Sequence, residues 1–179
     1  MNRLAFTVLA ACVAFANAAE SQEQQSRPPA SPTFGVSGGG GAGIAIPVGR
    51  LNDTQTAGYN FTGLVDFSAA DQPYSFRGEF IYQHYDRKRS TAGTESKNVV
   101  SVGAALLARR NAGASSAYAI GGIGVYRPTD EGTKPGVNVG AGLEVPLTFF
   151  IGIADVRLHL VLTENKPLVS IPITLGARF

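Results

Sequence analysis

Two histidines, His84 and His159, are the residues of this sequence best suited to acid–base chemistry. His159 ends a short run in which an acid, a base and an imidazole occupy every second position, with Asp155 and Arg157 before it. An imidazole that activates a nucleophile needs a side chain such as serine beside it. The residues around His159, from Leu158 to Val161, include none. We therefore expect His159 to be a hydrogen-bonded interior residue and the chain not to be an enzyme.

Other signatures of a reactive or binding site are weak. Residues Gly38 to Gly43 match the nucleotide-binding pattern G-x-G-x-x-G, but Ile44 to Pro47 cannot open the helix that would hold a phosphate. The spacing of metal ligands is also absent, so we expect no cofactor. Basic residues form only the short clusters 87–89 and 109–110. Both are predicted to be solvated turns, because nucleic-acid binding would require a longer basic stripe.

The N-terminus has the pattern of a secretion signal. A basic start at Arg3 precedes an apolar run from Leu4 to Phe15, and Ala16-Asn17-Ala18 matches an A-x-A cleavage site. We predict a cleaved signal peptide over residues 1–18 and a flexible tether over residues 19–32. Cys12 is either removed with the signal or, because the residues before it resemble a lipoprotein motif, lipidated.

From residue 33 onward, apolar residues alternate with polar ones in nearly every segment. Charged residues make up only 16% of the chain, against about 25% in an average protein. The period of two predicts strands, each near the ~9–11 residues that cross a bilayer at a tilt. The eight predicted strands are residues 33–46, 58–68, 74–85, 98–108, 117–126, 136–147, 150–162 and 169–179.

Eight strands without room for helical crossovers predict an antiparallel sheet, and hydrocarbon accepts only a sheet that closes on itself. The sequence therefore predicts an all-β fold, an eight-stranded antiparallel up-and-down transmembrane β-barrel over residues 33–179. The connections alternate in length, with long ones at residues 47–57, 87–97 and 127–135 and short ones at 69–73 and 148–149. We expect the long connections on the outer side of the membrane.

Aromatic residues are predicted to form two rims at the level of the lipid headgroups. The rim at the periplasmic ends of the strands comprises Phe34, Phe67, Tyr74, Phe76, Tyr118, Phe149, Phe150 and Phe179. The rim at the outer ends comprises Tyr59, Phe61, Tyr82, Tyr85 and Tyr126.

Charge decides which face of each strand points inward. A basic side chain exposed near the middle of the hydrocarbon costs about 2–4 kcal/mol, so the charged face should line the lumen. Opposite charges would pair there and offset their desolvation, which predicts a network with a structural role. The predicted lumen residues are Asp66, Arg77, Glu79, Glu144, Asp155, Arg157, His159 and Arg178. The glycine-rich strand 117–126 leaves its inward face undecided.

The last strand carries apolar residues at alternate positions and ends in an aromatic residue. Together with the signal peptide and the eight strands, this ending resembles the small outer-membrane barrels of the OmpA transmembrane-domain and OmpX/Ail kind. The resemblance implies that the outer-membrane assembly machinery recognises Ile173, Leu175, Ala177 and Phe179.

We expect a monomeric outer-membrane protein with a structural or surface-interaction role, neither a catalyst nor a nucleic-acid binder. Its outer loops, above all Arg87, Lys88 and Arg89, would contact host factors or the phosphates of lipopolysaccharide and other outer-membrane lipids. Three alternatives stay open: an enzyme that modifies outer-membrane lipid, a narrow channel, and a soluble, lipocalin-like periplasmic barrel. The soluble barrel would need its apolar face inside and its charges outside.

Overall fold

The computed structural model of the protein describes residues 34–69, 72–89, 95–129, 131–164 and 166–179. The predicted signal peptide over residues 1–18, with Cys12, and the predicted tether over residues 19–32 lie outside the described residues.

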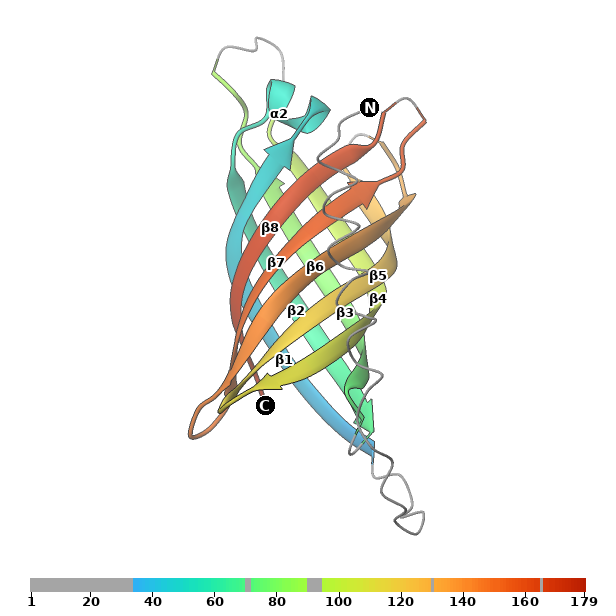
Figure 1. Cartoon of the computed structure of the whole chain (residues 1–179). Coiled ribbons are helices and arrows are strands. Elements are labelled where there is room, and N and C mark those ends of the chain that lie inside the picture. The colour runs from blue at the N-terminus through green and yellow to red at the C-terminus, as the bar shows by residue number, and fades with distance from the viewer. Residues whose placement is uncertain (1–33, 70–71, 90–94, 130, 165) are drawn as a thin grey trace. The chain divides into compact units, whose positions relative to one another are not determined.

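The described chain forms one antiparallel sheet that closes on itself (Figure 1). Each strand pairs with its neighbours in sequence, and the first strand also pairs with the last. This closed eight-stranded barrel confirms the predicted fold class. Its elements are β1 (Phe34–Val48), α2 (Arg50–Thr54), β2 (Gly58–Ala69), β3 (Tyr74–Tyr85), β4 (Lys97–Ala112), β5 (Ser115–Pro128), β6 (Lys134–Pro146), β7 (Ile151–Val161) and β8 (Leu168–Arg178).

The two ends of the barrel differ in their connections. The loop end, as we name it, carries the longer connections, residues 49–57, 86–96, 129–133 and 162–167. The terminal end carries the start of β1, the end of β8 and the connections 70–73, 113–114 and 147–150. Long and short connections therefore alternate as the sequence predicts.

The first long connection contains a short helix, α2, that the sequence analysis did not anticipate. Its Leu51 is only 4% exposed and packs at the loop end of the lumen with Ala45, Tyr85 and Val99. The connection folds because this one apolar side chain anchors it to the barrel. Within the described residues, no helix is long and apolar enough to cross a membrane.

Glycines in β1 permit the close approach of β8 that shuts the barrel. A Cβ atom added at Gly39 would collide with the backbone carbonyl of Ala177, and one added at Gly43 would collide with that of Ile173. The glycine run that resembles a nucleotide-binding loop is therefore part of a strand whose neighbour lies too near for a side chain.

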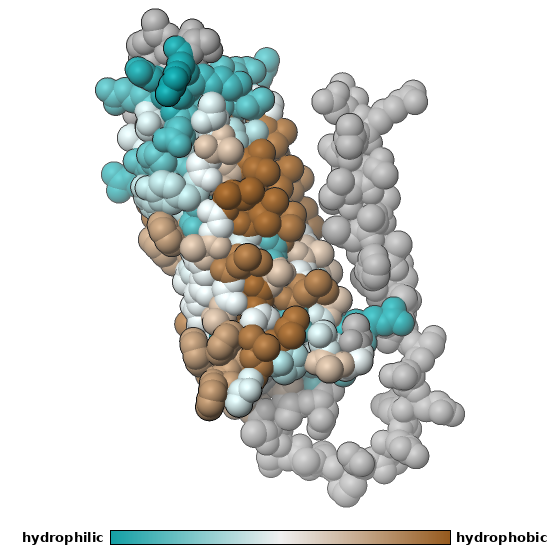
Figure 2. Space-filling model, turned by 90° about the vertical axis from the view of Figure 1, so that its left-hand side faces the viewer, coloured by the Kyte–Doolittle hydropathy of each residue, from teal (hydrophilic) through white to brown (hydrophobic). Residues whose placement is uncertain are grey.

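Side chains alternate between the lumen and the outer wall along the strands. On β7, Asp155 and Arg157 are 5% and 4% exposed, whereas Val156 between them is 46% exposed. On β8, Leu175 and the following Phe179 face outward. Hydrophobic residues cover most of the wall, and hydrophilic ones gather at the loop end (Figure 2). This arrangement contradicts the soluble, lipocalin-like alternative, which requires the opposite faces.

The sequence prediction ends the fourth strand at Ala108 and places Arg109 in a solvated turn, and the structure contradicts both. β4 continues to Ala112 because the inward alternation of Ala105 and Leu107 carries on through Arg109. The Arg109 side chain, only 17% exposed, reaches into the lumen.

Three tyrosines that the sequence analysis assigns to the rims, Tyr85, Tyr118 and Tyr126, are instead buried in the lumen. Glycines of β6 make the room for two of them. A Cβ atom at Gly142 would collide with the ring of Tyr118, and one at Gly136 would lie 2.6 Å from the ring of Tyr126. β5 therefore turns its tyrosines inward, which resolves the face that its sequence left undecided.

Candidate functional site: a charged network in the lumen

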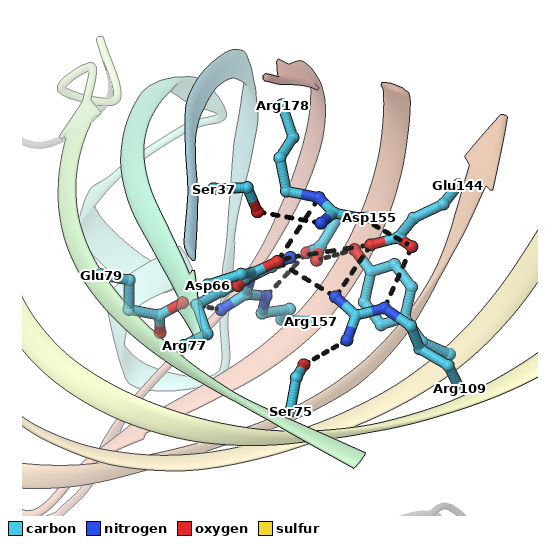
Figure 3. A network of polar contacts seen from close by, with 11 residues as sticks. Ser37, Asp66, Ser75, Arg77, Glu79, Arg109, Glu144, Asp155, Arg157 and Arg178 are labelled. Carbon is cyan, nitrogen blue, oxygen red and sulfur yellow. Dashed lines mark hydrogen bonds and ion pairs between the residues drawn. The ribbon is translucent and has the colours of Figure 1, made fainter. Parts of the chain in front are cut away.

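Asp66 lies at the centre of a charged network in the terminal half of the lumen (Figure 3). Arg77 donates to both of its carboxylate oxygens, from Nε to Oδ1 at 2.7 Å and from Nη2 to Oδ2 at 2.9 Å. Arg109 donates from Nη2 to Oδ2 at 3.0 Å, and Nε of Arg178 lies 3.5 Å from the same oxygen. One buried carboxylate thus binds three guanidinium groups.

Glu144 binds the same arginines from the opposite side. Arg109 donates to its two carboxylate oxygens at 3.0 and 3.1 Å, and Nη2 of Arg178 lies 3.1 Å from Oε2. Two serine hydroxyl oxygens accept the outer N–H groups: Ser37 from Arg178 at 3.0 Å, and Ser75 from Arg109. The guanidinium groups are therefore surrounded by acceptors, as buried charges must be.

A second group of charges continues the network toward the middle of the barrel. Arg157 donates to Asp155 at 2.8 Å and to Glu79 at 2.5 Å. The hydroxyl of Tyr118 donates to the other Asp155 oxygen at 2.7 Å, and its ring lies 5.6 Å from the guanidinium carbon of Arg77. Tyr118 thus joins the two groups of charges.

Every strand of the barrel contributes at least one member to this network. Four arginines face four carboxylates, so the described network carries no net charge, and each charge is paired. In strand order the members are Ser37, Asp66, Ser75, Arg77, Glu79, Arg109, Tyr118, Glu144, Asp155, Arg157 and Arg178. Because Arg178 of β8 and Ser37 of β1 are bonded, the network also crosses the seam where the barrel closes.

The loop half of the lumen is polar but largely uncharged. The hydroxyl of Tyr126 lies 3.2 Å from Nδ1 of His159, and the amide of Asn138 lies 3.5 Å from that hydroxyl. Thr174 donates to Asn60 at 2.9 Å. Further toward the loop end, Gln83 Oε1 accepts from Tyr85 at 2.7 Å and from Ser170 at 3.3 Å.

Apolar side chains seal the lumen above these polar groups. The buried cluster at the loop end comprises Ala45, Leu51, Tyr85, Val99, Tyr126, Val161 and Leu168. Beneath it, the cavity between Arg77 and His159 has a volume of only about 20 Å³, enough for about one water molecule. The described side chains therefore leave little free volume in this part of the lumen.

The structure places all eight residues predicted for the lumen inside the barrel, and it brings seven of them into the charged network. His159, the eighth, belongs to the uncharged half. Sequence reasoning missed four members of the network, the serines Ser37 and Ser75 and the larger Arg109 and Tyr118. The sequence could have revealed Arg109, because it lies two residues after Leu107 and so falls on the same inward face if the strand continues beyond Ala108. For Tyr118 the facing Gly142 is visible only once β5 and β6 are paired.

The residues predicted for the loops and the C-terminus lie on the outer surface. Lys88 donates to the backbone carbonyl of Asn52, and Arg87 pairs with Gln55 in an isolated bridge. Arg89 is exposed. At the terminal end, Phe179 lies 6.0 Å from Phe150 between ring centroids. Its alternate neighbours in β8, Ile173, Leu175 and Ala177, share the outward face.

Ser170 of β8 is the register partner of His159, and both side chains face the lumen. The Ser170 hydroxyl donates to Gln83 at 3.3 Å, and among the described residues no hydrogen bond joins it to His159. His84 faces outward, with Nδ1 at 2.7 Å from Asn98 Oδ1 and Nε2 at 3.4 Å from Asp86 Oδ1. The described residues also include no group of three His, Cys, Asp or Glu side chains that could hold a metal ion.

No protein-family model and no curated protein sequence matches this chain. Among solved structures, it is similar to neisserial surface protein A, with a TM-score of 0.62, 15% identity, and coverage of 82% of this chain and 97% of that one. It is similar to the Yersinia pestis outer membrane protein Ail, with a TM-score of 0.50, 16% identity, and coverage of 81% and 99%. It also matches the outer membrane enzyme PagL, with a TM-score of 0.48, 11% identity, and coverage of 82% and 99%. The chain thus has the fold of the small eight-stranded outer-membrane β-barrels.

Proposed function

We propose that this protein is an integral outer-membrane β-barrel whose lumen is a structural plug and whose loop end contacts molecules outside the cell. The observation that carries the proposal is the separation of faces: hydrophobic side chains cover the wall, and the charges are sealed inside. Among β-sheets, only a closed barrel leaves no unpaired backbone groups in hydrocarbon. The longer connections at the loop end support an outward orientation for that end.

The filled lumen supports a structural rather than a transport role. The apolar cluster around Leu51 separates the charged network from the loop end, and the cavity below it holds about one water molecule. We expect no steady conductance when the protein is placed in a planar bilayer, since an eight-stranded barrel is filled by its own side chains.

Localisation is the first test of the proposal. In a Gram-negative host, the protein should fractionate with the outer membrane and migrate differently on a gel before and after heating, because a folded barrel resists detergent. Recovery in the soluble periplasmic fraction would overturn the proposal. Replacing Phe179 with alanine should lower the amount that reaches the outer membrane, if the last strand is the assembly signal. Phe149→Ala changes another exposed phenylalanine of the terminal end and is the control.

The surface role is tested on the basic residues of the β3–β4 connection. We propose that Arg87, Lys88 and Arg89 bind phosphate groups from solution, since cations that donate hydrogen bonds bind phosphates strongly. The probe is deacylated lipopolysaccharide, which carries the phosphates without the acyl chains. Changing all three to glutamine should abolish its binding. Lys166→Gln, at the same end of the barrel, should leave binding unchanged, and equal binding by the two variants would contradict the assignment.

A further inference from the structure

Polar side chains interrupt the apolar outer wall near the loop end of β3, β4 and β5. The outward-facing positions there are His84, Asn98 and Arg127. Tyr59 of β2 stacks on His84 with ring centroids 4.9 Å apart. The hydroxyl of Tyr82 donates to Asn98 Oδ1 at 3.0 Å, and Nδ1 of His84 lies 2.7 Å from the same oxygen. The wall on this side therefore has a hydrogen-bonded polar edge.

The opposite side of the barrel has no such edge among its described residues. The outward-facing positions nearest the loop end of β7, β8 and β1 are Leu160, Val169 and Val48, all apolar. In the view of Figure 2, hydrophobic surface reaches higher on one side of the visible wall than on the other. Since hydrocarbon alone would favour an apolar wall all round, we expect the polar edge beside β3–β5 to lie among lipid headgroups.

Arg127 lies beside this polar edge. Two other cations near the loop end are paired, Lys97 with Glu131 at 2.8 Å and Lys134 with Glu164 at 2.8 Å. Arg127 is exposed and makes no hydrogen bond or ion pair in the part of the chain that the structure describes. Its five N–H groups are free to bind an anion, and a guanidinium group matches a phosphate in a two-point geometry.

An apolar track runs along β5 directly below Arg127. On the same outward face follow Val125, which is 53% exposed, Ile123, which is 70% exposed, and then Gly121, which has no side chain. The apolar side chains on this face of β5 therefore end at Gly121, four residues below Val125. This arrangement suits a lipid at the membrane interface. Its phosphate would meet the Arg127 guanidinium, and its acyl chain would lie along Val125 and Ile123.

We propose that Arg127, with the polar edge of Tyr82, His84 and Asn98 beside it, binds the phosphate of a glycolipid in the outer leaflet while an acyl chain lies along Val125 and Ile123. This inference rests on the proposed membrane location, but it concerns the barrel wall and not the basic loop residues. The occupant is a lipid within the leaflet, because a soluble partner would not reach a track that lies in hydrocarbon.

The test compares two arginines at opposite ends of the wall. Arg110 of β4 is also outward-facing and exposed, but it lies at the terminal end. The proteins are extracted from outer membranes, where the phosphate-bearing glycolipid is confined to the outer leaflet, and the glycolipid that stays bound is counted by native mass spectrometry. Arg127→Gln should lower retention roughly tenfold, as the loss of a hydrogen-bonded ion pair implies. Arg127→Lys should fall between, and Arg110→Gln should match the wild type.

Folding of each variant is checked by its heat-dependent gel migration, and both arginines are exposed, so neither change should disturb the lumen. Equal retention by wild type and Arg127→Gln, in protein that is folded and in the outer membrane, would overturn the lipid site alone. A protein that never enters the membrane fraction would overturn both the site and the proposed function.

Discussion

The two halves of the lumen use polar groups in different ways. In the terminal half, four arginines and four carboxylates share their contacts, and Asp66 alone binds Arg77, Arg109 and Arg178. In the loop half, small neutral groups bond in separate sets, such as Asn60 with Thr174. The loss of one charged group therefore leaves several charges without a partner. The loss of a neutral group such as Asn60 removes bonds only to neutral partners, the Thr174 hydroxyl and the backbone carbonyls of Ile44 and Ile173.

This difference explains where the barrel tolerates charge. A buried charge is stable only when several partners replace its hydration. Eight strands converge on the charged network and supply those partners, including two serines that each accept one further N–H group, from Arg109 and from Arg178. The loop half lies under an apolar cluster and carries no matching set of counter-charges among its described residues.

The largest effect is expected at the centre of the charged half. Asp66→Ala leaves three guanidinium groups without a shared acceptor and should lower the free energy of unfolding by about 3–5 kcal/mol. Asn60→Ala, the matched change in the loop half, should cost only about 1–2 kcal/mol. The measurement is urea unfolding in detergent micelles followed by circular dichroism, because the chain has no tryptophan. Equal losses of unfolding free energy in the two variants would contradict the proposed difference between the charged and the neutral half.

A new charge in the neutral half should also be costly. In Asn138→Asp, a carboxylate replaces the amide that lies 3.4 Å from Glu79 Oε1 and 3.5 Å from the Tyr126 hydroxyl. The variant loses a donor and places two like charges together, so it should unfold about 3 kcal/mol more easily at neutral pH. The same unfolding assay repeated at acidic pH, where the new carboxyl is protonated, should recover part of the loss. A loss that does not change with pH would show that charge is not its cause.

A smaller contrast compares two buried tyrosines on one strand. Tyr118→Phe removes the donor to the Asp155 carboxylate and should cost about 2 kcal/mol, the range for hydrogen bonds to charged groups. Tyr126→Phe removes a bond between neutral groups and should cost about 1 kcal/mol. Each phenylalanine keeps the ring over its facing glycine, so packing is matched. A larger loss of unfolding free energy in Tyr126→Phe than in Tyr118→Phe would contradict the proposal that the charged half contributes the stronger bonds.

The smallest effect concerns an ion pair outside the lumen. The hydrogen bond from Lys134 and its positive charge hold the pKa of the exposed Glu164 carboxyl below the ordinary glutamate value. With the folded pKa lowered, any stabilisation is present above the ordinary glutamate pKa and disappears as pH falls through the folded value. Solvent screens the pair, so the stability should not change measurably. Titration by NMR should show the Glu164 pKa rising in Lys134→Gln; an unchanged titration would contradict the pairing.

The strands and the lumen face were predictable because each depends on a pattern within one segment. Alternation along β7 places Asp155 and Arg157 inward whatever the neighbouring strands are. What escaped prediction depends on pairs of segments. Tyr118 faces inward over a glycine of another strand, and Leu51 anchors α2 only because the lumen mouth is there to receive it. Arg109 is an intermediate case. The alternation of β4 predicts its inward face, but the sequence does not show that the strand continues far enough to include it.

The central claim is that the charged face of each strand lines the lumen while the apolar face contacts hydrocarbon. Nitroxide labels placed one at a time along β7, in Cys12→Ser protein embedded in bilayers, test it most directly. We predict that oxygen, which concentrates in hydrocarbon, collides often with labels at Ala154, Val156 and Leu158. Collisions should be rare at the inward-facing Ile153 and His159, which lie just before and just after these three positions. Collision rates without a period of two, or with the two faces exchanged, would contradict the account.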